Sequence, residues 1–261
     1  MPEGPEVTIN IDYIKSITDK FVLKDVQILG GRYKKNPNTL KNYNKFIESL
    51  PSKYKKFSNK GKFIYIILEN NWSIWITYGM SGHLTQEEGK KHNNVQFIME
   101  NEKHNFYFND VRNFGTTQFH ENLEELDKKL ESLGPDPLRE QKNTKYFIDK
   151  IRKMNQTKVI SEVLMDQKLY SGVGNYIRAE VLYRSKINPF LTLVELTDEQ
   201  LKTIVDNIYF ILKRAYDDEQ NGTKYKFEIY AQKEDYYGNP VHKKEQPRIK
   251  RTIHWVPAVQ K

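Results

Sequence analysis

Residues 158–185 read KVISEVLMDQKLYSGVGNYIRAEVLYRS, and this stretch decides the architecture of the second half of the chain. Apolar residues recur at helical spacing on both sides of a glycine-containing centre. The pattern predicts one helix over Lys158–Gln167 and a second over Asn175–Ser185. Gly172 and Gly174, in the connection between them, would permit a close backbone approach and a positive φ.

The start of the second predicted helix has the features of an anion site. Its first backbone amides and the positive end of its dipole favour a phosphate. Asn175 either adds a side-chain donor there or caps the helix. An ordinary helical hairpin, whose glycines are needed only for steric reasons, explains the same residues equally well, so the stretch alone leaves both interpretations open.

The patterns on either side predict an α+β chain. A helix follows Pro5, because Val7, Ile11 and Ile14 fall on one face. Short runs rich in Ile, Trp, Tyr and Phe then predict antiparallel strands over Phe63–Leu68, Trp72–Tyr78, Val95–Met99 and Phe106–Phe108. Further helices are expected over Glu121–Leu133, Tyr146–Lys153 and Asp198–Tyr216, and short strands over Lys226–Ala231 and Thr252–Val256. We therefore predict an N-terminal antiparallel β-sandwich with flanking helices, followed by a helical domain that ends in a β-hairpin.

The predicted domain boundary lies at Leu133-Gly-Pro-Asp-Pro-Leu138, because two prolines prevent a helix from continuing through it. We expect an N-terminal domain over residues 1–132 and a linker over residues 133–142. A helical domain over residues 143–223 and a C-terminal finger over residues 224–261 complete the chain.

Composition favours a polyanionic partner. The formal net charge is +8, and 13% of the residues are aromatic. The chain has no cysteine, which excludes disulfides and thiolate-bound zinc, and the six histidines form no recognisable metal cluster. No signal peptide or membrane-spanning run is evident. We expect an intracellular, soluble monomer, located in the nucleus or cytoplasm.

The beginning of the chain suggests amine catalysis. Removal of Met1 would expose Pro2, whose secondary amine has a lower reference pKa than a lysine amine. Attack of this amine on a sugar C1′ gives an iminium ion, which favours elimination of the 3′ phosphate. Glu3 could protonate the sugar ring oxygen. Without further context, MPEGPE is more simply a proline-bounded helix start.

Six motifs in order supply that context. They are MPEGPEV at the start, Gly61-Lys62, Tyr78-Gly-Met-Ser-Gly82, Asn109-Asp-Val-Arg-Asn-Phe-Gly115, Leu133-Gly-Pro-Asp-Pro137 and Gly172-Val-Gly-Asn-Tyr176. Over nearly its whole length, the chain resembles the formamidopyrimidine-DNA glycosylase/endonuclease VIII (Fpg/Nei) family. The resemblance implies a DNA glycosylase with AP lyase activity in base excision repair, with Pro2 as the nucleophile through a Schiff base.

The resemblance also implies roles for further residues. Residues 158–185 correspond to the family's helix–two-turn–helix, with Asn175, Gly172 and Gly174 at the phosphate of the lesion. Lys62 matches a phosphate-contacting lysine of the catalytic site, with Lys60, two residues earlier, as the alternative. Glu180 matches an acidic residue, for which we expect a structural role.

The end of the chain resembles the zinc finger of the family without its cysteines. Val256 and Val259 stand where cysteines would be, and Arg251 falls on the arginine that binds the lesion's phosphate. We therefore expect the zincless finger of the Nei-like branch and no metal cofactor. Apolar packing by Ile253, Trp255 and the two valines would hold the hairpin.

Three residues are candidates to fill the gap left by a flipped base. Met80 and Phe114 are apolar wedge candidates, although without the motifs both would be read as core residues. Asn113 stands where many family members carry the arginine that pairs with the opposite base. The short connection over Asp217–Lys226 differs from the long loop of members specialised for oxidised purines. Together these features predict oxidised pyrimidines and further-oxidised guanine as substrates, followed by β,δ-elimination.

The expected partner is double-stranded DNA with oxidised bases or abasic sites, and single-stranded DNA is a second candidate. A non-catalytic damaged-DNA-binding protein of the same fold is the first alternative, although intact Pro2, Glu3 and Lys62 argue against it. A basic RNA-binding or structural accessory protein is the second, but it does not predict the ordered motifs.

Overall fold

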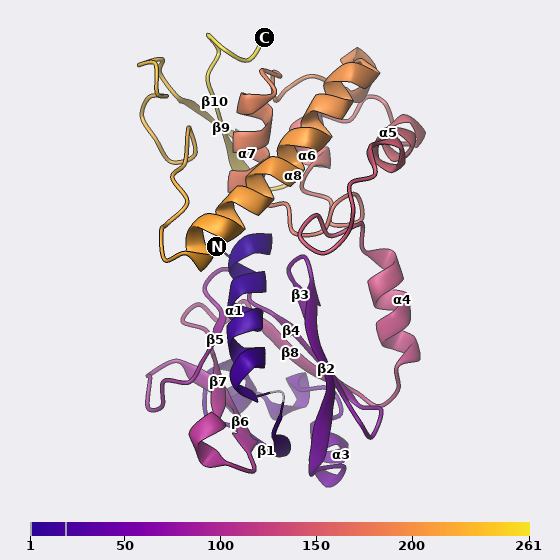
Figure 1. The fold of residues 1–261 in the computed structure, drawn as a ribbon, viewed down its shortest axis with the longest axis vertical. Helices are drawn as coiled ribbons and strands as arrows, with labels where there is room; N and C mark the ends of the chain where they lie inside the picture. Colours follow the sequence, from indigo (N-terminus) through magenta and orange to yellow (C-terminus); the bar gives the residue numbers. More distant parts are fainter. Residues whose placement is uncertain (1, 19) are drawn as a thin grey trace. The chain divides into compact units, whose positions relative to one another are not determined.

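The computed structural model describes residues 2–18 and 20–261. These residues form two compact units (Figure 1). The first unit contains Pro2 and residues 6–132, and the second contains residues 3–5 and 133–261. Helix α1 (Gly4–Thr18) therefore begins in the second unit and continues in the first.

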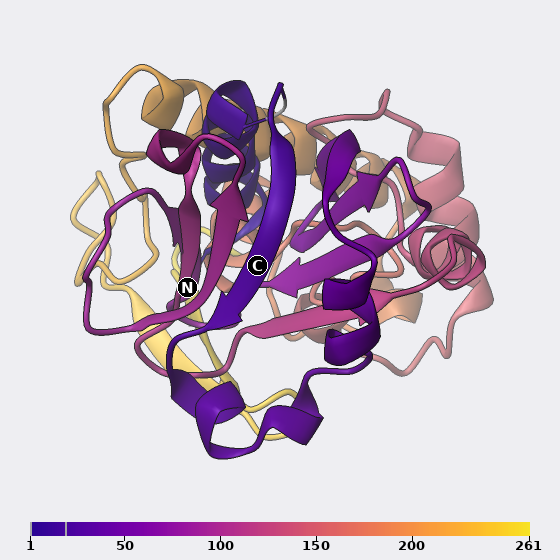
Figure 2. The same ribbon diagram turned by 90° about the horizontal axis from the view of Figure 1, so that it is seen from below.

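The first unit is built on antiparallel strands, which in the described residues form one sheet with the order β5-β7-β6-β1-β2-β3-β4-β8. Their bounds are β1 Val22–Ile28, β2 Ser52–Lys60, β3 Phe63–Leu68, β4 Ser73–Thr77, β5 His83–Thr85, β6 Asn93–Met99, β7 Phe106–Asn109 and β8 Thr116–His120. The pairs Val22↔Lys53 and Leu23↔Ser52 join β1 to β2. The strands on either side of this short junction share one apolar core, which gives the predicted sandwich (Figure 2).

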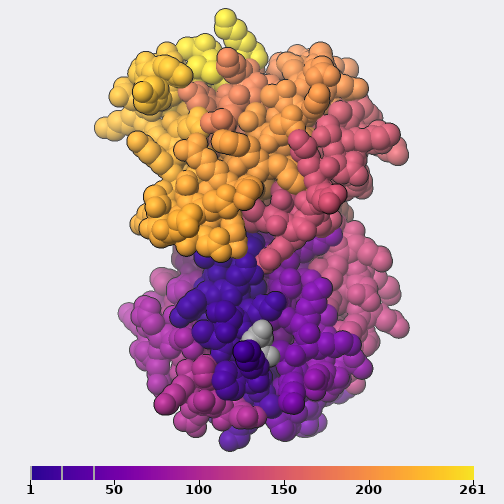
Figure 3. Space-filling model, in the orientation of Figure 1, coloured from indigo at the N-terminus to yellow at the C-terminus, as the bar shows by residue number. Residues whose placement is uncertain are grey.

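The core of the first unit follows from sequence periodicity. Ile64 and Ile66 of β3 are fully buried in the core that also contains Phe97 of β6, because alternate strand residues point to the same face. Val7 and Ile11 of α1 enter the same core, as predicted from their helical spacing. The outer side of α1 remains on the surface (Figure 3).

Shorter helices complete the first unit: α2 Gly31–Lys35, η1 Pro37–Thr39, α3 Tyr43–Glu48, η2 Glu102–His104 and α4 Glu124–Ser132. The polar, Lys- and Asn-rich stretch over residues 32–62 contains α3 and the long strand β2. Its sequence SKYKKFSNK gives little strand signal, because most of its side chains face solvent. Only Ser52, Phe57 and Asn59 are buried in this strand.

The second unit is helical, with α5 Thr144–Lys153, α6 Ile160–Val163, α7 Asn175–Arg184, η3 Leu193–Glu195 and α8 Asp198–Gln220. Helix α7 is almost entirely buried, which explains its apolar residues on every side. The predicted helix over Lys158–Gln167 is reduced to the four residues of α6. One reason is that Val159 forms a β-bridge with Thr192, which takes the residue before α6 out of helical geometry.

The finger is a hairpin of β9 (His242–Gln246) and β10 (Arg251–Trp255). The predicted strand over Lys226–Ala231 is wrong. The amides of residues 228–230 donate instead to the carboxylate of Glu180, at 2.8, 3.0 and 2.8 Å, so they do not join a ladder. Among the described residues, no helix combines the length and apolar character that crossing a bilayer requires.

Candidate functional site

The carboxylate of Glu3 lies at the N-terminus of α7. It accepts hydrogen bonds from the amide of Tyr176 at 2.9 Å and from the amide of Ile177 at 3.3 Å. The side chain is only 1% exposed. An anion at this end of a helix is stabilised by the unpaired amides and by the helix dipole. The residue bonded to Pro2 is therefore fixed against the helix–two-turn–helix.

Gly172 and Gly174 make this close approach possible. The amide of Gly4 donates to the carbonyl of Gly172 at 3.0 Å. A Cβ at Gly174 would lie 2.2 Å from the carboxylate carbon of Glu3. Gly172 has a φ of 97°, a conformation that other residues rarely adopt. Both positions therefore require glycine for steric reasons: Gly174 because of Glu3, and Gly172 because of its backbone conformation.

One expectation about the helix start differs from the structure. We expected the first amides of α7 to face a phosphate, but the amides of Tyr176 and Ile177 are already occupied by Glu3. The amide of Gly172 is also occupied, since it donates to Oε1 of Gln167 at 3.0 Å. A protein carboxylate thus takes the position that the local sequence suggested for an external anion.

Asn175, the first residue of α7, is held by a buried arginine. Its Oδ1 accepts from Nε and from a terminal nitrogen of Arg178, at 3.1 and 2.7 Å. Its Nδ2 donates to the carbonyl of Thr252 in β10 at 3.1 Å. The side-chain amide of Asn175 thus directs its donor toward the strand that carries Arg251.

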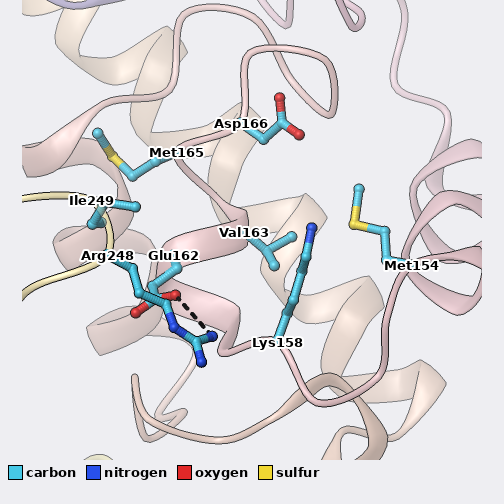
Figure 4. A pocket seen from close by; sticks show the side chains of 8 residues that line it. All are labelled: Met154, Lys158, Glu162, Val163, Met165, Asp166, Arg248 and Ile249. Carbon is cyan, nitrogen blue, oxygen red and sulfur yellow. Dashed lines mark ion pairs between the residues drawn. The ribbon is translucent and has the colours of Figure 1, made fainter.

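Arg251 begins β10 and is half-buried, and its guanidinium donates to the carbonyl of Lys250 at 3.0 Å. Arg248, in the turn before it, is directed elsewhere. Its guanidinium pairs with Glu162 at 3.9 Å, and both residues line a pocket of about 330 Å³. Figure 4 shows this ion pair among the side chains of the pocket. Of these two arginines, the structure places only Arg251 on the strand that Asn175 contacts.

Lys62 lies in the two-residue turn between β2 and β3 and is half-buried. Asn59 fixes this turn by donating to the carbonyl of Gly61 at 2.8 Å. The same amide donates to Oγ1 of Thr8 in α1 at 2.9 Å. The Lys62 turn is therefore attached to the helix that follows Pro2. Met1, whose removal would expose the Pro2 amine, lies outside the described residues.

The loops that carry Met80 and Phe114 pack against each other. A Cβ at Gly79, where φ is 60°, would lie 2.7 Å from backbone atoms of Phe114 and Gly115. The buried carboxylate of Asp110 joins the loops, because it accepts from the hydroxyl of Ser81 at 2.6 Å and from the amide of Gly115 at 2.7 Å. The structure thus brings the two wedge candidates together.

The three gap-filling candidates differ in exposure. Phe114 is 57% exposed, whereas Met80 and Asn113 are half-buried. Asn113 has a φ of 56°, and its Oδ1 accepts from Nδ2 of Asn94 at 3.0 Å. Exposure of Phe114 separates it from the core phenylalanines and leaves its ring accessible.

Comparisons with known proteins identify the chain. Its residues 1–117 match the formamidopyrimidine-DNA glycosylase N-terminal domain, residues 133–226 the formamidopyrimidine-DNA glycosylase H2TH domain, and residues 217–261 the formamidopyrimidine-DNA glycosylase C-terminal domain. The chain belongs to the formamidopyrimidine-DNA glycosylase family. The family's C-terminal domain is therefore present here without a single cysteine.

Individual relatives agree with this membership. The formamidopyrimidine-DNA glycosylase of Ureaplasma parvum is 31% identical over 81% of this chain and 77% of its own length. That of Rickettsia bellii is 30% identical over 82% and 78%. The crystal structure of the Fpg protein of Thermus thermophilus has a TM-score of 0.83 at 22% identity, covering 99% of this chain and 98% of its own. A Lactococcus lactis Fpg complex with tetrahydrofuran-containing DNA and an inhibitor has a TM-score of 0.85 at 22% identity, and the match covers 100% of both chains.

The finger of this family member shows no conventional metal set. Within residues 2–18 and 20–261, no three His, Cys, Asp or Glu side chains are grouped to hold a metal ion. The hairpin is attached through Ile253 and Val256, which pack against Ala179 and Tyr183 of α7. Packing of this kind can fix a hairpin without a metal.

Sequence reasoning missed two groups that organise these sites. Arg178 was not predicted to be buried, because charged residues are usually exposed. Asp110 lies in the motif over residues 109–115, but its role in joining two loops was not predicted. Both are fully buried. The charged pair Arg178 and Glu180 within a helix whose other interior residues are mostly apolar was the available signal for the first.

Proposed function

We propose that this chain is a bifunctional DNA glycosylase and AP lyase of base excision repair, with the Pro2 amine as nucleophile. Family membership supports the glycosylase assignment. The observation that carries the rest is the fixation of Glu3 by the amides of α7. Because Pro2 is bonded to Glu3, its amine adjoins the residue whose carboxylate is held by α7.

The proposed reaction proceeds through a covalent bond between Pro2 and the sugar. The Pro2 nitrogen bonds to C1′ of the flipped nucleotide while the bond to the damaged base breaks, and the base leaves with a proton. The Glu3 carboxylate takes up the proton that the attacking Pro2 nitrogen loses and delivers it to the ring oxygen, which opens the sugar and leaves an iminium ion. Loss of a 2′ proton then expels the 3′ phosphate, and a second elimination expels the 5′ phosphate. Water then hydrolyses the iminium, which frees the Pro2 amine and the sugar fragment and leaves a gap with a phosphate on each side.

The proposed DNA contacts divide between the units. In the second unit, Asn175 and Arg251 bind the phosphate of the lesion, with Gly172 and Gly174 shaping the turn. In the first unit, Lys62 binds a neighbouring phosphate. Met80 and Phe114 fill the gap in the duplex, with Asn113 on the loop beside the opposite base.

We propose oxidised pyrimidines and further-oxidised guanine as the preferred substrates, in duplex DNA or a single strand. The structure adds support, because α8 extends to Gln220 and leaves only residues 221–227 before the segment bound by Glu180. This connection is short for a loop that would cover a flipped purine. Placement in the Nei-like branch, a zinc-free finger and a monomeric state belong to the same proposal.

Borohydride trapping tests the proposal. The Met1-processed chain is incubated with duplex DNA containing an oxidised pyrimidine, or an abasic site, and reduced. A covalent adduct that is greatly reduced in Pro2→Gly is the expected result. Binding of both duplexes without any adduct would refute the lyase and establish the non-catalytic damaged-DNA-binding protein instead.

A further inference from the structure

The largest fully buried side chain of the described residues belongs to Arg178 in α7, with 0% exposure. Its guanidinium donates twice to Oδ1 of Asn175, at 3.1 and 2.7 Å. One terminal nitrogen also donates to the carbonyl of Ser161 at 2.9 Å and to Oε1 of Gln246 at 2.7 Å. Each of these acceptors is uncharged, so the hydrogen bonds do not neutralise the cation.

Keeping this cation buried is costly. Burial lowers the pKa of Arg178 to about 10, and attraction to Glu3 acts in the opposite direction. The guanidinium therefore remains charged at neutral pH. An apolar residue of similar volume would avoid the desolvation penalty. Packing alone therefore does not account for an arginine at this position, and the geometry of its hydrogen bonds has to be considered.

The hydrogen bonds of Arg178 lead to both residues that are proposed to bind the phosphate, directly to Asn175 and through Gln246 to Arg251. The forked contact occupies Oδ1 of Asn175 and so turns Nδ2 toward β10, where it donates to the carbonyl of Thr252 at 3.1 Å. On its other side, the guanidinium holds Gln246 of β9, whose register partner in β10 is Arg251. Gln246 is 4% exposed and also donates to Oγ of Ser161 at 2.7 Å, which ties β9 to α6.

We propose that Arg178 is a positioning residue that orients the Asn175 amide and holds the hairpin carrying Arg251 in register with it. The finger has no cysteine. The hydrogen bonds of Arg178 instead keep the side chains of Asn175 and Arg251 at a constant distance from each other, so that both reach the same phosphate. The inference rests on the proposed function, because it concerns how that DNA site is assembled. Arg178 itself does not touch the DNA.

Substitutions at Arg178 and Asn175 in the full chain test this role. Affinity is measured for a short duplex with one tetrahydrofuran abasic-site analogue and for its undamaged counterpart. We expect Arg178→Met to weaken binding of the analogue about tenfold or more, which corresponds to one charge-assisted hydrogen bond. Adding Asn175→Ala should then change little, because the two substitutions remove the same contact. Additive losses would overturn the proposal, since a merely structural arginine does not couple to Asn175 in binding.

Two further variants test whether the effect comes from the double hydrogen bond between Arg178 and Asn175. One keeps the positive charge at position 178, and the other removes an arginine elsewhere. Arg178→Lys keeps the cation but cannot make the forked contact, so it should remain as weak as Arg178→Met. Native affinity in the lysine variant would overturn the positioning role. Arg214→Met on α8 is the matched control, because that arginine is partly exposed, with its carboxylate partner Asp218 at 3.8 Å. This control should bind like the native chain.

A second route covers the case in which Arg178→Met does not fold. Gln246→Met leaves both contacts between Arg178 and Asn175 intact and removes the hydrogen bonds that join β9 to Arg178 and to Ser161. We expect it to reduce the loss of affinity caused by Arg251→Ala, and an unchanged effect of Arg251→Ala would overturn the proposal. If the native chain does not prefer the analogue to undamaged DNA, the proposed function fails instead.

Discussion

Replacing Gly174 by alanine should displace Glu3 without breaking the backbone. Gly174 has an extended backbone, with φ −137° and ψ −155°, which alanine can adopt. The added Cβ would lie 2.2 Å from the carboxylate carbon of Glu3 and 2.5 Å from both of its oxygens. Because these atoms end a flexible side chain, the carboxylate has to move away from α7.

The cost follows from the two hydrogen bonds that are lost, which measure 2.9 and 3.3 Å. Hydrogen bonds to a charged group contribute about 1.5–3 kcal/mol each, and the longer one contributes less. We therefore expect about 2–4 kcal/mol of destabilisation. A carboxylate moved by more than an ångström also leaves its catalytic position, so base removal in a single turnover should slow by about a hundredfold.

The assay combines urea unfolding with single-turnover release of an oxidised pyrimidine from duplex DNA. Gly30→Ala is the matched control, because Gly30 also precedes a helix in an extended conformation. The nearest neighbours of its added Cβ would be at 3.4 and 3.5 Å, which is ordinary contact. Native stability and rate in Gly174→Ala would refute the reasoning that this glycine is required by Glu3.

Three further outcomes are expected. Glu180→Gln should destabilise the chain by about 2–4 kcal/mol in urea unfolding, because an amide cannot accept all three backbone hydrogen bonds from residues 228–230; an unchanged midpoint would contradict this. Burial, with Lys243 and Arg178 nearby, lowers the pKa of His254. The unfolded histidine therefore binds a proton more readily, so the thermal midpoint should fall as the pH drops below about 6.5, and less steeply in His254→Gln. Phe114→Ala should change stability by less than about 0.5 kcal/mol, since the ring is 57% exposed, yet slow base removal from duplex DNA more than from a single strand; equal slowing on both would exclude a wedge role.

The fold class could be predicted from the residue patterns alone, and the family from the order of the motifs. Strand β3 was predicted to the residue, because Phe63–Leu68 is an uninterrupted run of isoleucine, leucine and aromatic residues. Helical spacing likewise placed α1 and α7. The apolar run of β3 and the helical spacing of α1 and α7 are both local patterns, since each depends only on residues within one element.

Tertiary structure decided where polar groups find their partners. Residues 226–231 carry a strand-like sequence, but the carboxylate of Glu180 binds their amides and prevents a ladder. The amides at the start of α7 suggested a phosphate, yet Glu3, from the other end of the sequence, occupies two of them. Arg178 gave no periodic signal, because its role depends on Asn175 and Gln246 together. Hydrogen-bond partners far apart in sequence are chosen by the packed fold, and no local pattern of residues encodes them.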